Sequence, residues 1–379
     1  MSTPPEVVVK VIGIVAKTVR RGNWKQKSGH NGSTGTCRLD CAQMARKEEE
    51  YGRKPGAHRR KGGYLWAALG AILIGVVGAA LTLGAPVPLS DLWSNDASRA
   101  EVAREIFWHL RPARIGAGLL VGASLAVSGA ALQSTFRNPL AEPYLLGISA
   151  GGALGAALGL AFSLSSLVPV LAFGGALASA FAVYSIGASG PDFDRARLLL
   201  VGVALSAFLS AALSLTVTLS SRAELAQQIL FWTLGGLAEV SAAQLWVLAI
   251  SLFGGIVLLL FSARDMNALR LGDDDARTLG VEVRGLHRRL LLAAALMSAA
   301  AVSCAGLIGF VGLLAPHIVR KVFGDDARVL VPAAAIGGAA LLCGCDAIAR
   351  SVLAPIEIPV GIVTALLGVP LFLHLARRA

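Results

Sequence analysis

Long apolar stretches without charged residues alternate with short polar segments along most of the chain. Each of the longest reaches or exceeds the roughly 20 residues that an α-helix needs to cross a bilayer. These uncharged stretches cover residues 62–90, 115–136, 143–191, 198–221, 240–263 and 290–319, and two further apolar segments follow at 329–349 and 358–376. The pattern therefore predicts an all-α, polytopic membrane protein.

Two of the apolar stretches are too long for a single crossing. Residues 143–191 hold 49 residues without a charge, which predicts a helical hairpin that turns near 163–169. Residues 290–323 are long for one helix, but Gly306 and Gly309 offer a turn and Pro316 a break, so two short helices are predicted. The prediction is then about ten membrane spans, with both termini on the same side.

The distribution of basic residues indicates which side that is. With a cytoplasmic N-terminus, the inner segments beyond residue 63 carry 14 Arg and Lys, and the outer segments carry 6. Cytoplasmic loops are enriched in Lys and Arg, so both termini are predicted inside. The outer basic residues are Arg99, Arg104, Arg111, Arg114, Arg222 and Arg350.

The composition agrees with a membrane protein and locates the net charge. The chain is 55% hydrophobic and 15% charged, too apolar for an ordinary soluble domain. Of the net +11, most belongs to residues 1–63, which hold 14 Lys and Arg against 5 Asp and Glu, while the rest holds 20 against 18. Residues 1–63 are predicted to be a disordered cytoplasmic extension, with Met44 as an alternative native start, and 64–379 the transmembrane domain. No nucleic acid partner is predicted.

If this membrane protein is a transporter, the absence of certain motifs limits which energy sources it could use. No Gly-Lys dipeptide occurs in the chain, so it has no P-loop for ATP. A gradient-driven secondary transporter, the alternative class, usually has ionisable groups within its spans. Here the clearest is Asp346, for which an ion pair with Arg350 four residues later is expected. A membrane-embedded enzyme needs a polar cluster at one depth, and none is apparent; the five cysteines show no metal-ligand spacing.

A polar junction separates the second and third predicted spans. Pro139 and Pro143 lack amide donors and disfavour helix at the residue before them, so one helix should end near Arg137 and another begin near Pro143. Asn138 can cap or turn the chain, and Glu142 would sit favourably at the positive end of the helix that follows. The segment is predicted to be a structured cytoplasmic turn.

The largest inner loop contains a short segment with helix-capping signals at both ends. Asp273 is predicted as the N-cap, Arg277 lies four residues later, and Gly280 can close the helix in the left-handed conformation. A helix outside the membrane could be a solvated connector, but its two caps favour a docking element. The candidate residues are Leu271, Gly272, Asp273, Ala276, Arg277, Leu279 and Gly280.

Taken in order, several segments make the chain resemble a known family. It is similar to the permease subunits of iron-siderophore, haem and vitamin B12 ABC importers, the FecCD type, over about residues 64–378. The matching segments are 110–114, 120–130, 137–149, 198–204, 271–280, 308–318 and 359–370.

The resemblance implies a type II ABC importer permease in the bacterial inner membrane. Its expected partners are a second copy of the permease, two ATP-binding subunits, an extracytoplasmic substrate-binding protein and membrane lipid. ATP and Mg would bind to the partner ATPase, and this chain would hold no cofactor or metal of its own and perform no catalysis. The expected cargo is a ferric siderophore, then haem, then cobalamin.

The resemblance also assigns roles to residues. The segment around Asp273 becomes the coupling loop that fits the ATPase. Arg111 and Arg350 are expected to meet acidic residues of the binding protein, with lipid headgroup contact as the alternative for Arg111. The cytoplasmic gate falls on Asp194, Arg195 and Ala196, a departure from the small hydroxyl residues expected in vitamin B12 importers.

Overall fold

The computed structural model describes residues 55–82, 93, 96–188, 193–220, 223–238, 240–354 and 356–376. The chain divides into two units, Met1–Lys61 and Gly62–Ala379. The predicted disorder of the extension and the alternative start at Met44 lie outside the described residues. The described helices belong to the second unit, apart from the first turns of the helix Pro55–Thr82, which begins in the first unit.

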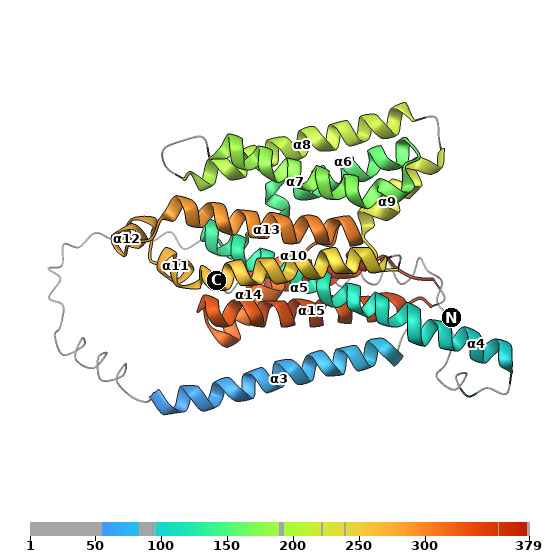
Figure 1. Cartoon of the computed structure of the whole chain (residues 1–379), viewed down its shortest axis with the longest axis horizontal. Helices are drawn as coiled ribbons and strands as arrows, with labels where there is room; N and C mark the ends of the chain where they lie inside the picture. The colour runs from blue at the N-terminus through green and yellow to red at the C-terminus, as the bar shows by residue number, and fades with distance from the viewer. Residues whose placement is uncertain are drawn as a thin grey trace, which may run out of the picture. The chain divides into compact units, whose positions relative to one another are not determined.

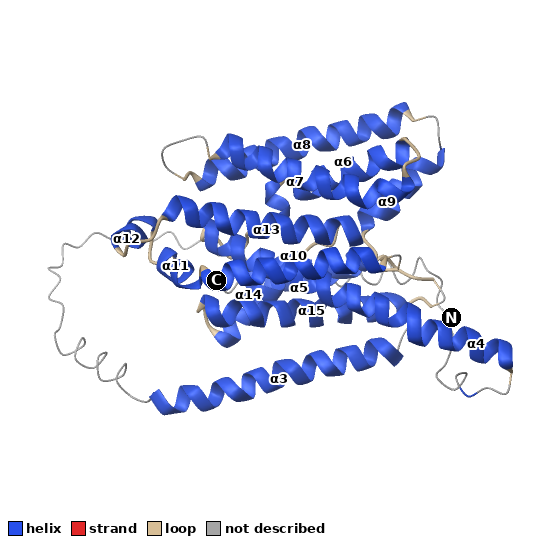
Figure 2. Ribbon diagram, in the orientation of Figure 1, coloured by secondary structure: helices blue, strands red, loops and turns tan. Residues whose placement is uncertain are grey.

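The described part of the chain is helical, with no strand in it (Figure 2). Seven of its helices are long and apolar enough to cross a membrane. The elements are α3 (Pro55–Thr82), α4 (Ala97–Glu105), η2 (Ile106–Leu110), α5 (Arg111–Phe136), η3 (Pro143–Leu146), α6 (Ile148–Ala161), η4 (Ser165–Leu167), α7 (Val168–Gly187), α8 (Arg195–Leu219), α9 (Ala223–Leu234), α10 (Ala242–Phe261), α11 (Ala263–Leu269), α12 (Asp273–Thr278), α13 (Val283–Ala305), α14 (Val311–Phe323), α15 (Ala327–Ser351) and α16 (Val360–Ala376).

The prediction of an all-α membrane protein is confirmed. A helix lies in each predicted span, but α6, α14 and α16 have only 14, 13 and 17 residues, so the count of ten spans is approximate. The hairpin is present as α6 and α7, and the chain turns at Ser163, whose φ is 58°. The second pair is present as α13 and α14, separated at Gly306 with a φ of 68°. Pro316 does not break the chain as predicted but lies inside α14, since neighbouring helices can compensate for a lost backbone bond in a membrane.

Burial separates central from peripheral helices. In their most apolar windows α5 is 83% buried and α13 is 72% buried, whereas α3 is 6% and α8 is 11% buried. In Figure 1, α3 and α8 accordingly lie along opposite sides of the bundle, with α5 and α13 between them. The exposed apolar side chains of α3 and α8 are suited to lipid or to a second protein surface.

Glycine sets the close packing at the centre. A Cβ added at Gly129 of α5 would lie 1.8 Å from the carbonyl oxygen of Gly312 in α14, closer than any real contact. The two backbones can therefore approach this closely only because Gly129 has no side chain, as is common where helices pack in lipid. This contact fixes α14 against the middle of α5.

Candidate functional site

The predicted docking helix is present as α12, at the end of the bundle opposite α4 (Figure 1). Its N-cap is Gly272, with a φ of 144°, and Asp273 is the first helical residue rather than the predicted cap. Gly280 has a φ of 84° and closes the segment in the left-handed conformation, as predicted. Ala276 is fully buried and seats the helix on the core.

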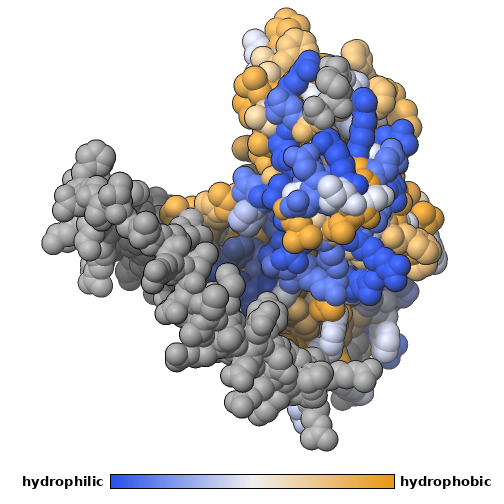
Figure 3. All heavy atoms as spheres, turned by 90° about the vertical axis from the view of Figure 1, so that its left-hand side faces the viewer, coloured by the Kyte–Doolittle hydropathy of each residue, from blue (hydrophilic) through white to orange (hydrophobic). Residues whose placement is uncertain are grey.

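The outward face of α12 mixes apolar and charged side chains. Leu271 and Leu279, which flank the helix, are 64% and 63% exposed. Arg277 pairs with Asp274 at 3.0 Å, not with Asp273 as its spacing suggested. Viewed from this end, the molecule presents a largely hydrophilic face with isolated apolar patches (Figure 3). We call it the α12 end, and the opposite one the α4 end.

The predicted gate residues and the predicted coupling helix are in direct contact. Asp194 caps α8 by accepting hydrogen bonds from the amides of Ala196 at 2.9 Å and Arg197 at 3.1 Å. The Arg195 guanidinium, one residue on, donates to Asp273 Oδ1 at 2.5 Å and to the Thr135 carbonyl at 2.9 Å. Asp273 therefore does not cap its own helix because its carboxylate is held by the start of α8.

This contact also accounts for the electrostatics of Asp273. Burial alone would raise the pKa of the Asp273 carboxyl, but the hydrogen bond and charge of Arg195 outweigh burial and hold that pKa below its usual range. The Asp273 carboxylate therefore stays ionised at neutral pH.

Two aromatic residues that the sequence did not single out complete this cluster. The rings of Phe193 and His287 are stacked, with centroids 3.8 Å apart and planes 9° from parallel. His287 is fully buried, and its Nε2 lies 3.6 Å from Asp273 Oδ2. A histidine in the first turns of α13 gives no local signal of this contact, because its partners lie in two other segments of the chain.

The polar junction between α5 and α6 has the predicted turn. α5 ends at Phe136, and Arg137 adopts a φ of 50°. Asn138 Oδ1 accepts a hydrogen bond from the amide of Leu140 at 2.9 Å, which forms a local turn that leaves Pro139 exposed. The α-helix that follows starts at Ile148, after the short η3 segment, rather than at Pro143.

Glu142 caps a helix, but not the predicted one. Its Oε1 accepts a hydrogen bond from the amide of Phe310, 2.7 Å away, at the start of α14. The neighbouring Pro143 ring faces Gly312 in the first turn of α14. The junction thus turns back into the bundle, and the carboxylate meets the positive end of α14 instead of its own helix.

Arg111 and Arg350 were expected on the outer surface, but the structure buries both to 4% exposure. Arg350 donates to the Ala80 carbonyl at 3.2 Å, and Arg111 donates to the Leu81 carbonyl. These carbonyls belong to the last turn of α3 and have no partner within the helix. The docking role of the two arginines stays a prediction, and it requires their exposure to change.

Acidic residues at the α4 end pair with Arg350 and with the nearby Arg114. Asp346 Oδ2 lies 3.0 Å from Arg350 Nε, as the spacing of four residues predicted. The same carboxylate contacts Arg114 at 3.0 Å, and Arg114 also reaches Glu357 at 2.8 Å. We call Arg114, Asp346, Arg350 and Glu357 the outer ion cluster.

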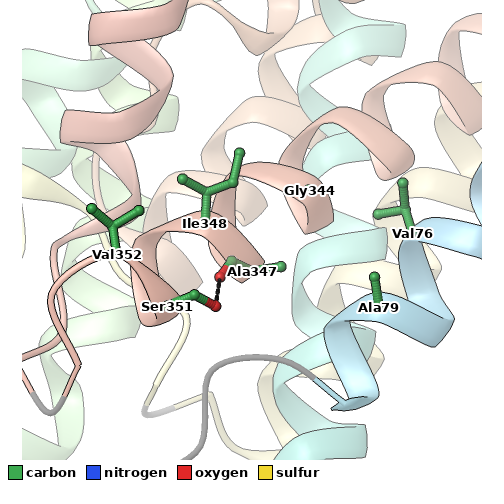
Figure 4. A pocket seen from close by; sticks show the side chains of 7 residues that line it. All are labelled: Val76, Ala79, Gly344, Ala347, Ile348, Ser351 and Val352. Carbon is green, nitrogen blue, oxygen red and sulfur yellow. Dashed lines mark hydrogen bonds between the residues drawn. The ribbon is translucent and has the colours of Figure 1, made fainter.

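A cavity of about 280 Å³ opens nearby between α3 and α15. Figure 4 shows its lining, Val76, Ala79, Gly344, Ala347, Ile348, Ser351 and Val352. The Ser351 hydroxyl donates to the Ala347 carbonyl at 2.7 Å, so the wall offers little chemistry for a polar ligand. Among the described residues no group of three or more His, Cys, Asp or Glu could hold a metal ion.

Comparison with known proteins identifies relatives across most of the chain. The sequence model of the FecCD transport family matches residues 71–378. A cobalamin import system permease protein, BtuC, from Halobacterium salinarum is 46% identical over 73% of this chain and 74% of its own length. A hemin transport system permease protein, HmuU, from Yersinia pestis is 40% identical over 82% of this chain and 95% of its own length.

A solved structure agrees with the sequence relatives. A chain of a solved structure, described as an inward-facing conformation of a metal-chelate type ABC transporter, is 30% identical, with a TM-score of 0.73. It covers 84% of this chain and all of its own.

Proposed function

Because this chain belongs to the FecCD transport family, we propose that it is the permease subunit of an ATP-driven importer in a bacterial inner membrane. It works as a dimer of permeases with two ATP-binding subunits and an extracytoplasmic substrate-binding protein. The α12 end faces the cytoplasm, with both termini on that side. The excess of Arg and Lys in the segments at that end supports this orientation.

The observation that carries the proposal is the shape of α12. It is a six-residue helix beyond the membrane helices, seated by Ala276 and bounded by glycines with positive φ. The exposed Leu271 and Leu279 flank it. A small, well-fixed projection with apolar side chains is suited to insert into a cleft of the ATP-binding partner.

ATP and Mg bind to that partner, because this chain has no P-loop. ATP binding draws the two copies of α12 together and switches the central path between outward-open and inward-open states. The proposed gate residues lie at the start of α8, beside α12; they are Asp194, Arg195 and Ala196. A displacement of α12 would therefore reach the gate before it reaches other parts of the bundle.

The cargo is a bulky metal chelate. The relatives are named for cobalamin and hemin, and the solved neighbour for a metal chelate. The order siderophore, haem, cobalamin stays a prediction. An arginine at position 195, in place of the small hydroxyl residue of vitamin B12 importers, argues against cobalamin as the cargo. Its hydrogen bond to Asp273 weakens that argument, because it explains the arginine without reference to the cargo.

The test is to disable α12 without removing the protein from the membrane. Gly280→Pro cannot adopt the φ of 84° and removes the amide that donates to Arg277. Asp273→Arg places a cation against Arg195. Both variants should reach the membrane and lose ATP-dependent uptake of a ferric hydroxamate, haemin or cyanocobalamin, whichever the unmodified complex transports.

The matched control is Gly324→Pro, at another helix end with the same φ of 84° and no neighbouring atom within 4 Å. It should retain uptake. Normal uptake in both α12 variants would refute the coupling role. Uptake that survives loss of the ATP-binding subunit but stops with a protonophore would show a gradient-driven transporter instead.

A further inference from the structure

Arg195 occupies a position where three segments of the chain meet. It is the first residue of α8, yet its guanidinium bonds to the carbonyl of Thr135 in the last turn of α5 and to Asp273 of α12. The contacts join residues 60 and 78 positions apart in sequence. One planar group with several donors can hold two acceptors in fixed directions, which a lysine cannot do as well.

The surroundings favour a strong and directional contact. The side chains of Arg195 and Asp273 are 25% and 18% exposed, so water screens them only partly. The centre of the Phe193 ring lies 6.0 Å from the Arg195 guanidinium carbon, and the same ring is stacked on His287. Neither nitrogen of His287 has a hydrogen-bond partner among the described residues. The imidazole therefore packs beside the ion pair and does not replace Arg195 as the hydrogen-bond donor to Asp273.

α12 has little else that could transmit a force. Ala276 is its buried residue, and a methyl group in a socket resists compression but not sliding or tilting. The ion pair of Asp274 with Arg277 lies within α12, so this particular pair does not connect α12 to a membrane helix. Of the ion pairs of Asp273 with described residues, the pair with Arg195 connects α12 to a membrane helix at the shorter distance, and His287 approaches Asp273 from farther away.

We propose that Arg195 is a positioning residue that makes α12 and the start of α8 move as one body. The role rests on the proposed function of α12 and adds a specific link between ATPase docking and the gate. Through Thr135 the same guanidinium carries the movement to the end of α5, next to the Asn138 turn. A motion imposed on α12 therefore reaches two segments of the bundle at once.

The first experiment measures the link without any cargo. Spin labels at Thr278 and Arg197, both exposed and neither among the proposed docking residues, report the distance between α12 and α8 within one copy of the permease in the assembled complex, where labelled copies are diluted with unlabelled ones. The distribution should be narrow with and without ATP in the otherwise unmodified protein, and broad in Arg195→Gln and Asp273→Asn. An equally narrow distribution in both variants would overturn the proposal, whether or not the complex transports anything.

The second experiment measures coupling in proteoliposomes that contain the complex and its binding protein. Cargo uptake per ATP hydrolysed should fall about tenfold in Arg195→Gln and in Asp273→Asn, while ATP hydrolysis continues. Because the two residues act as one unit, the double variant should be no worse than either single variant, and Arg195→Lys should recover part of the loss. Multiplying effects in the double variant would overturn the proposal.

The matched control is Arg289→Gln, which removes another guanidinium at the α12 end, paired with Asp265 at 3.4 Å. It should leave uptake per ATP unchanged, and a loss equal to that of Arg195→Gln would overturn the assignment to Arg195. Absence of ATP-driven uptake in the unmodified complex would refute the proposed function, while the label distances would still decide the link.

Discussion

Each end of the bundle holds arginines that pair with an aspartate, and the arginines at the two ends have different roles. At the α4 end, Arg114 and Arg350 share Asp346 and join long helices that already pack over many turns. At the α12 end, Arg195 holds Asp273 on a six-residue helix with one buried residue. An ion pair between well-packed helices adds to stability, whereas one that attaches a small projection mainly determines where the projection lies.

The two sets of ion pairs differ in solvent exposure, and exposure determines how much free energy is lost when one partner is removed. Asp346 and Arg350 are each 4% exposed, so removal of Asp346 would leave Arg350 as a buried charge without its counter-charge. Asp273 and Arg195 retain contact with water and would be solvated. Changes at the α4 end should therefore lower stability, and changes at the α12 end should lower coupling.

The largest effect is expected from Asp346→Ala. It leaves Arg114 and Arg350 buried without their shared carboxylate, which costs about 3–5 kcal/mol for a buried pair. Thermal unfolding of the detergent-solubilised protein, followed by loss of the monodisperse fraction, should show a large drop in midpoint. An unchanged midpoint would mean that the outer ion cluster is not a stabilising element and would remove the contrast between the ends.

The features that could be predicted from the sequence are those determined by residues close together in the chain. The span pattern, the turn at Gly306 and the left-handed Gly280 all follow from local composition, because apolar length and glycine's freedom act within a few residues. The Asp346 and Arg350 pair was found for the same reason, since residues four apart on a helix face each other. The α12 helix itself could be placed to within two residues.

The sequence could not predict which distant group each polar residue meets. The helix-capping preferences apply over only a few residues, so they assigned Asp273 and Glu142 each to the helix that follows it in sequence. In the structure their partners lie 78 and 168 positions away. The burial of Arg111 and Arg350 was missed likewise, because it depends on where the last turn of α3 packs.

A smaller effect on stability is expected from Asp273→Asn. The variant removes the negative charge that holds Arg195, but both groups reach water, so the loss should be no more than about 1 kcal/mol. The same unfolding assay should place this variant close to the unmodified protein, while its uptake per ATP falls. A drop in the unfolding midpoint as large as that of Asp346→Ala would show that the ion pairs at the two ends contribute equally to stability.

The smallest effect is expected from Glu357→Gln, within the outer ion cluster itself. Glu357 is 51% exposed and contacts Arg114 at 2.8 Å, but Arg114 keeps its bond to Asp346. Solvent screens such a pair, so its removal should change the free energy of unfolding by about 0–1 kcal/mol. Raising the salt concentration should shrink even that difference, because exposed charges are screened more than buried ones. If Glu357→Gln and Asp346→Ala lower the unfolding midpoint equally, burial is not what distinguishes the arginine contacts of this protein, and the contrast between its two ends would have to rest on helix packing alone.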